Sequence, residues 1–154
     1  MRTCALALQQ QVFAILREEK TTTRLVERLQ AIPVPGPKEA SASLVKQYSS
    51  PWFRFFATYD PAPALAKVRC PVLAIGGERD LQVLPDQNLP AIEAALKAGG
   101  NTNYTVLRLP GLNHLLQRAG TGVPAEYAQI EETMAPAALD TITAWLRKRT
   151  GLER

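Results

Sequence analysis

The sequence is poor in the residues that build disulfide frameworks and metal sites. Its 154 residues include one histidine and two cysteines, Cys4 and Cys70. Two distant cysteines without a CxxC motif or a Cys/His cluster argue against a disulfide scaffold and against zinc. No phosphate loop is found, because "GGERD" lacks the required glycine spacing and lysine. We therefore expect no metal and no organic cofactor, and the cysteine usage favours a reducing, cytoplasmic location.

Long hydrophobic runs are also lacking. The opening stretch "MRTCALALQQQVFAIL" has an apolar patch, but glutamines interrupt it. A membrane span needs about 18 or more uninterrupted apolar residues, and a signal peptide has a different arrangement. We expect neither a signal peptide nor a membrane partner.

The excess of positive charge is not organised as a nucleic-acid surface. The net charge is +4, but most basic residues alternate with acids, and only "RKRTGLER" near the C-terminus is dense. A basic last helical turn is expected from the helix dipole alone. No basic patch interleaved with aromatic residues accompanies it. We expect no nucleic-acid binding, and a small domain that binds nucleic acid through this tail is the least supported alternative.

The N-terminal part of the chain has helical patterning. Apolar residues recur at helical spacing between residues 4 and 31, with three threonines from Thr21 to Thr23 interrupting them. This pattern predicts two amphipathic helices or one bent helix. The proline-rich stretch "PVPGPKEA", residues 33–40, predicts a loop. The aromatic-rich stretch that follows predicts a short helix ended by Pro61, and burial of its rings in a core is favoured over a role as a pocket lining.

From Val68 onward the pattern is that of an α/β protein. Residues 70–77, "CPVLAIGG", form a continuous apolar run typical of a buried strand of a parallel sheet. A helix is predicted over 85–100, a second strand over 103–111 and a final helix over 135–151. Alternation of strand and helix predicts two parallel strands joined by a crossover helix.

Two chemically versatile residues follow these strands. Asp80 lies after the first strand, in "GGERDLQVLP", and His114 lies after the second, in "LPGLNHLL". Loops after parallel strands leave from the same carboxyl edge of a sheet, so the two side chains can meet. An acid that accepts the Nδ1 proton of a histidine leaves the other ring nitrogen free to take a proton from a nucleophile. The alternatives are that His114 is a packed or surface residue and that Asp80 closes a turn.

These two loops carry a family resemblance. "VRCPVLAIGGERDLQV" followed by "LPGLNHLLQ" resembles the C-terminal third of serine-dependent α/β-hydrolases of the esterase and acyl-peptidase type. The resemblance implies that Asp80 is the acid and His114 the base of a Ser-His-Asp triad. It implies a partial α/β-hydrolase fold, a short parallel sheet of two strands per chain, over residues 51–154. Residues 1–50 are similar to the helical cap and linker of such enzymes.

The nucleophile of that triad is missing. Serine hydrolases of this fold present their serine in a G-x-S-x-G elbow upstream of the acid and base, and this chain has no such motif. Its serines, Ser41, Ser43, Ser49 and Ser50, have no flanking glycines, and neither cysteine is placed on an elbow. An acid and a base without a nucleophile and oxyanion donors do not perform ordinary acyl transfer.

Two interpretations follow. In the first, the chain is part of a carboxylic-ester hydrolase, acts on a small ester only when another segment or chain supplies the serine, and Met1 marks a truncation. In the second, it is a non-catalytic orphan fragment with a binding or structural role. An apolar strand with one missing neighbour invites pairing with another chain, so we expect a homodimer through the sheet edge near Val72. The substrate is not specified by the sequence.

Overall fold

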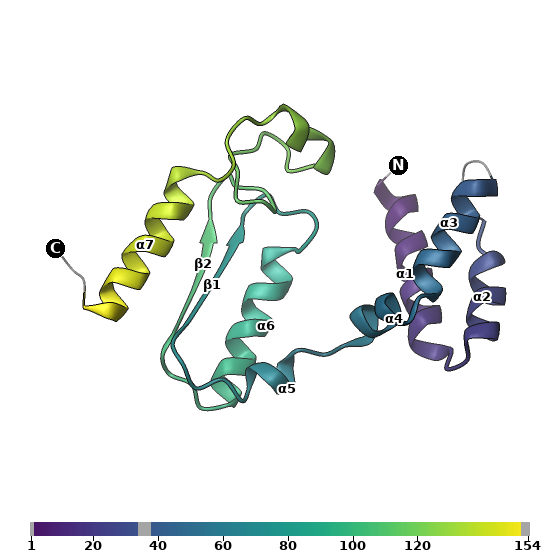
Figure 1. The fold of residues 1–154 in the computed structure, drawn as a ribbon, viewed down its shortest axis with the longest axis horizontal. Helices are drawn as coiled ribbons and strands as arrows, with labels where there is room; N and C mark the ends of the chain where they lie inside the picture. Colours follow the sequence, from purple (N-terminus) through teal and green to yellow (C-terminus); the bar gives the residue numbers. More distant parts are fainter. Residues whose placement is uncertain (1, 34–37, 152–154) are drawn as a thin grey trace. The chain divides into compact units, whose positions relative to one another are not determined.

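The structure is a computed structural model that describes residues 2–33 and 38–151 (Figure 1). The chain divides into two compact units, Met1–Asp60 and Pro61–Arg154. We call them unit 1 and unit 2. None of the helices in the described ranges is both long enough and apolar enough to cross a membrane.

Unit 1 is a bundle of four helices (Figure 1). They are α1 (Arg2–Glu18), α2 (Thr22–Gln30), α3 (Lys38–Ser49) and α4 (Pro51–Thr58). The threonine interruption separates α1 from α2, so the first helical stretch is two helices. The bundle has its own apolar core, built from Val12, Ile15, Leu16, Leu25, Leu29 and Val45. Burial of such side chains is the main favourable term in forming a small bundle.

Three predictions made from the sequence differ from the observed structure of unit 1. Residues 38–40, expected in the loop, form the first turn of α3, while residues 34–37 of that loop lie outside the described residues. The aromatic stretch contains part of one helix and all of another, because Ser50 caps α4 by accepting a hydrogen bond from the Phe53 amide at 3.2 Å. The division at residue 50 places α4 with the second part of the chain, whereas Phe53 and Ala57 pack on the core of unit 1.

The prediction that the aromatic rings are buried is wrong for most of them. Trp52, Phe55 and Phe56 keep 69%, 65% and 63% of their surface exposed. Aromatic residues that occupy so many consecutive positions point around the whole helix, so only one side can face the core. The exposed rings pair with one another instead, since Trp52 stacks on Phe56 with ring centroids 5.4 Å apart.

Unit 2 is a small α/β fold (Figure 1). Its elements are α5 (Ala62–Leu65), β1 (Val72–Gly77), α6 (Pro85–Ala98), β2 (Tyr104–Leu109), the 3₁₀ helix η1 (Pro124–Gln129) and α7 (Pro136–Thr150). The two strands are parallel, as predicted, in a register that pairs Val72 with Tyr104 and Gly77 with Leu109. Figure 1 shows α6 and α7 on opposite sides of the strands.

The helices hold the strands through contacts on both faces. Leu89 of α6 packs at 3.5 Å from the position that a Cβ on Gly76 would take, and Leu96 of α6 is fully buried. On the other face, the Trp145 indole of α7 donates a hydrogen bond to the Thr105 hydroxyl at 3.2 Å. Both strands therefore have fixed positions, and with them the loops that leave their carboxyl ends.

Candidate active site

The site lies where the two parallel strands end. Beyond β1, the amide of Glu78 donates to the carbonyl of Leu109 at 2.8 Å, and the amide of Arg79 donates to the carbonyl of Leu112 at 2.8 Å. These backbone hydrogen bonds continue the pairing of the strands into the two loops. They bring the Asp80 loop alongside the His114 loop, as the position of both loops at one sheet edge predicts.

The structure brings together the two residues that the sequence singles out. The His114 Nδ1 and Asp80 Oδ2 atoms are 2.9 Å apart. The Asp80 residue is 5% exposed, whereas the His114 side chain is 38% exposed. A buried acid thus holds one nitrogen of a base whose other side reaches the surface.

Close packing between the loops requires a glycine at the end of β1. A Cβ added to Gly77 would lie 2.3 Å from the Leu112 carbonyl oxygen and 2.4 Å from that of Asn113. Any larger residue would push the His114 loop away from β1. The "GG" of the sequence signals this approach of two backbones, which is one of the uses of glycine at the end of a strand.

The environment of Asp80 favours the carboxylate. Its Oδ1 atom accepts hydrogen bonds from the amides of Gln82 and Val83 at 2.9 and 2.8 Å, which leaves Oδ2 to His114. Burial acts to raise the pKa of Asp80, but the hydrogen bonds from Val83, His114 and Gln82 outweigh it and lower the pKa. The acid is therefore ionised and oriented at neutral pH.

His114 is left with one free nitrogen. An ionised carboxylate can only accept, so Nδ1 carries the proton in the hydrogen bond to Asp80. The Nε2 atom makes no hydrogen bond to the part of the chain that the structure describes. A neutral imidazole in this tautomer has a lone pair on Nε2, which is the arrangement of a general base.

An apolar cavity of about 210 Å³ lies beside the pair. Its walls come from β1, from α6 and from the two loops, and Asn88 is its polar residue apart from the pair itself. The apolar side chains that line it are Ile75, Val83, Pro85, Leu89, Ile92 and Leu116. Such a cavity takes a small apolar group rather than a charged one.

A third loop supports the Asp80 loop from outside. The Arg79 guanidinium donates to the Ala119 carbonyl, and the Gln82 side-chain amide donates to the Tyr127 hydroxyl at 2.9 Å. Within this loop the Glu126 carboxylate accepts hydrogen bonds from the amides of Thr121 and Gly122 at 3.0 and 2.9 Å. The loop from residue 119 to 129 is therefore held by its own carboxylate.

Within unit 2, the described residues place no serine and no cysteine beside the pair. Unit 2 contains no serine, and its cysteine, Cys70, is exposed and precedes β1 at the end opposite to Asp80. In unit 1, the hydroxyl of Ser50 donates to the Gln47 carbonyl at 2.8 Å. Ser43 and Ser49 also belong to α3, and the side chains of Cys4 and Ser41 lie outside the described residues.

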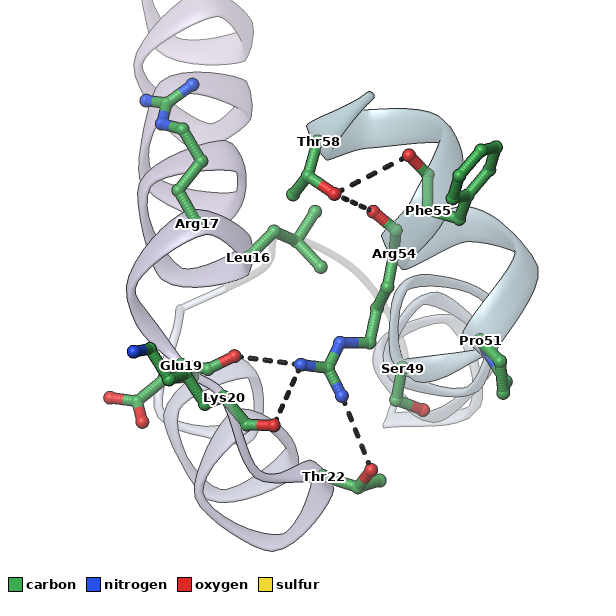
Figure 2. A pocket seen from close by; sticks show the side chains of 10 residues that line it. All are labelled: Leu16, Arg17, Glu19, Lys20, Thr22, Ser49, Pro51, Arg54, Phe55 and Thr58. Atoms are coloured by element: carbon green, nitrogen blue, oxygen red, sulfur yellow. Dashed lines mark hydrogen bonds between the residues drawn. The ribbon is translucent and has the colours of Figure 1, made fainter. Parts of the chain in front are cut away.

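A second cavity, of about 530 Å³, lies within unit 1 (Figure 2). Figure 2 shows the Arg54 guanidinium reaching from α4 to the end of α1. It donates to the carbonyls of Glu19 and Lys20 at 2.9 and 3.2 Å. These carbonyls belong to the two residues that directly follow the last residue of α1, so Arg54 ties the end of α1 to α4.

Metal ligands do not gather in the described ranges, where no group of three or more His, Cys, Asp or Glu side chains is placed to hold an ion.

Comparisons of the chain with protein-family models, with curated proteins and with solved structures found no match. The candidate site consequently rests on the geometry of Asp80, His114 and their surroundings.

Sequence reasoning missed the residues that support the pair. Asn113 and Gln117 are both buried, at 0% and 7% exposure, in the loop that carries His114. The signal in the sequence was the asparagine itself, because Asn side chains commonly close turns on nearby backbone amides. The backbone amides that hold Asp80 have no sequence signal, since every residue except proline provides one.

Proposed function

We propose that this chain carries the acid and the base of a serine-type carboxylic-ester hydrolase, with Asp80 as the acid and His114 as the base. The observation that carries the proposal is the 2.9 Å contact between Asp80 Oδ2 and His114 Nδ1, with Nε2 left free. The nucleophile comes from another segment or chain. The resemblance of the two loops to those of α/β-hydrolases supports the same assignment.

The chemistry follows from the orientation of the ring. Nε2 takes the proton of an approaching hydroxyl, and Asp80 stabilises the imidazolium that forms. Such a base contributes about 10²–10⁴-fold to a rate. The apolar cavity beside the pair suits the acyl or alcohol part of a small ester.

Release of p-nitrophenolate from a short-chain p-nitrophenyl ester tests the proposal. The ester is given to the purified chain together with a small alcohol as the missing nucleophile, and free histidine at equal concentration sets the background. We expect release above this background that depends on the alcohol and is lost in His114→Ala and reduced in Asp80→Asn. Equal rates for the chain, both variants and free histidine contradict it.

The alternative function is that of a non-catalytic fragment that assembles as a homodimer with a binding or structural role. The observation that supports it is the incomplete burial of β1, where Val72 to Gly76 are only partly buried. An apolar groove of about 490 Å³ runs beside this strand, lined by Leu73, Trp145 and Leu146 among others. Exposed strand edges of this kind pair with other chains.

Light scattering at micromolar concentration distinguishes a monomer from a dimer. The dimer proposal expects twice the monomer mass for the chain and a monomer for Leu73→Lys, because a charge at the strand opposes pairing. Leu107→Lys, on β2, is the matched control and stays dimeric. A well-folded monomer for the unaltered chain removes the dimer proposal and leaves the esterase test unaffected.

A further inference from the structure

We propose that Asn113 is the positioning residue that holds the His114 ring against Asp80. The inference rests on the proposed function in that His114 is the base of the site. The contacts on which it rests involve only Asp80, His114 and the loop that carries the histidine. It can therefore be tested in the chain as it is, without a nucleophile or a substrate.

The Asn113 side chain forms hydrogen bonds with two residues, Leu115 and Gln117, that come soon after His114 in the same loop. Its Oδ1 atom accepts hydrogen bonds from the amides of Leu115 and Gln117 at 2.9 and 3.0 Å. Its Nδ2 atom donates to the Gln117 Oε1 atom at 3.0 Å. The backbone of His114 is thus enclosed in a turn that Asn113 closes from the inside.

The turn is fastened to the rest of unit 2 through Gln117. The Asn113 amide donates to the Gln117 carbonyl at 2.9 Å, and the Gln117 side chain donates to the Glu132 carbonyl at 2.9 Å. The Leu116 carbonyl accepts from the Ala135 amide at 2.9 Å, just before α7. The direction of His114 therefore depends on contacts that reach the start of α7.

The turn also contains one residue, Leu116, in an unfavourable backbone conformation. Leu116 has a φ of 58°, which is the left-handed region that residues with a branched side chain rarely adopt. Such a conformation persists only where the surroundings determine it. Without the Oδ1 acceptor, the part-buried Leu115 amide and the buried Gln117 amide lose their partner, and Leu116 is free to return to a relaxed conformation. The His114 ring then moves away from Asp80.

Asn101 provides a matched control. It is also buried, at 6% exposure, and its side chain donates to the carbonyls of Val68 and Cys70 at 3.1 and 3.0 Å. It accepts from the Asn103 amide at 2.8 Å. It performs the same kind of bracing beside the beginnings of β1 and β2, at the sheet edge opposite to His114. Loss of Asn101 tests what general destabilisation of unit 2 does.

The experiment uses nuclear magnetic resonance of the single histidine in the full chain. Its Nδ1 proton, held by a carboxylate, gives a low-field signal, and the ¹⁵N shifts of the ring report the tautomer. We expect the signal in the unaltered chain, its loss with a mixed tautomer in Asn113→Ala, and its retention in Asn101→Ala. Asn113→Ser, whose hydroxyl closes the same turn more weakly, keeps a reduced signal.

Three outcomes overturn the inference. A full signal and an unchanged tautomer in folded Asn113→Ala remove the role of Asn113. If Asn113→Ala does not fold, a full signal in Asn113→Ser has the same meaning, as does loss of the signal in Asn101→Ala, which would make it a measure of stability alone. Absence of the signal from the unaltered chain is different, because it removes the Asp80–His114 bond and with it the proposed function.

Discussion

At the scale of single residues, the candidate site consists of a buried acid, Asp80, and a base, His114, that reaches the surface. Asp80 uses one carboxylate oxygen for backbone amides and the other for His114. The backbone hydrogen bonds fix the acid, and the acid fixes the ring. This order explains why a residue with 5% exposure remains ionised.

The stability of unit 2 should depend on the ionisation of Asp80. Its pKa is lowered in the folded chain, so its contribution is present above the unfolded value of about 3.9 and disappears as the pH falls through the folded pKa. We expect Asp80→Asn to cost about 1.5–3 kcal/mol at pH 7, the range for hydrogen bonds to a charged group. The cost should shrink below about pH 3.9.

Chemical denaturation of both proteins from pH 7 downward measures this difference. The control is Asp86→Asn, whose carboxylate is 77% exposed and pairs with Arg108, because an exposed pair contributes only about 0–1 kcal/mol. A cost for Asp80→Asn that stays constant at acid pH would refute the assignment of the carboxylate as the stabilising form.

Glu126 should keep its loop ordered far below neutral pH. Hydrogen bonds from the amides of Thr121, Gly120 and Gly122, and from the Thr121 hydroxyl, lower the pKa of Glu126 to about 2. Its stabilising effect is therefore full above the ordinary pKa of 4.5 and is lost only as the pH falls through about 2. We expect the Gly120 and Gly122 amide signals to shift with this midpoint, and Glu126→Gln to lose their protection from exchange at pH 7. A midpoint near 4.5 would contradict it.

At the scale of elements, the site depends on how closely two strand ends approach. Two parallel strands with helices on both sides would place Asp80 and His114 on one edge in any protein of this pattern. Whether the side chains touch depends on the crossing of the loops, where the Arg79 amide bonds to the Leu112 carbonyl. Gly77 makes that crossing possible.

Gly77→Ala should therefore disturb the site, and Gly76→Ala should not. The added methyl group at Gly77 meets two backbone oxygens at 2.3 and 2.4 Å, whereas at Gly76 its nearest neighbours are side-chain atoms at 3.5 Å. We expect Gly77→Ala to cost roughly 1–3 kcal/mol, as overpacking does, and to remove the Nδ1 signal of His114. Thermal unfolding and resonance spectra of the two variants, compared side by side, decide the matter. Equal effects of both would show that the loops yield easily.

At the scale of the whole molecule, the chain consists of two units with separate cores. The apolar core of unit 1 is built from α1, α2 and α3, and that of unit 2 from β2, the His114 loop and α7. Every hydrogen bond described for Asp80, Asn113 and His114 comes from residues of unit 2. The candidate site is consequently a property of unit 2.

Residues 61–154 alone should retain the site. We expect this shortened chain to fold and to show the same His114 Nδ1 signal as the full chain, because it keeps every hydrogen bond described above for the ring and its loop. The control is the shortened chain with Asp80→Asn, which lacks the signal. A shortened chain that folds without the signal would indicate that unit 1 contributes to the site.

Patterns in the sequence predicted the elements of unit 2 better than those of unit 1. The apolar run before Gly77 and the β-branched run after Tyr104 predicted two parallel strands, and both are present. Strand and helix periodicities are local properties, so they can be read from neighbours in the chain. The start of α3 was not predicted, because the prolines before it predicted a loop without showing where that loop ends.

The sequence by itself determined which residues can perform chemistry, since one histidine and the acid after the first strand are a short list that composition and order supply. It also determined that no serine elbow accompanies them. Only the tertiary structure decided that the two side chains meet at 2.9 Å, that Asn113 closes the turn beneath the histidine, and that most aromatic rings of α4 remain exposed. The physical reason is that these outcomes depend on the packing of loops and helices distant in sequence, which local patterns do not encode.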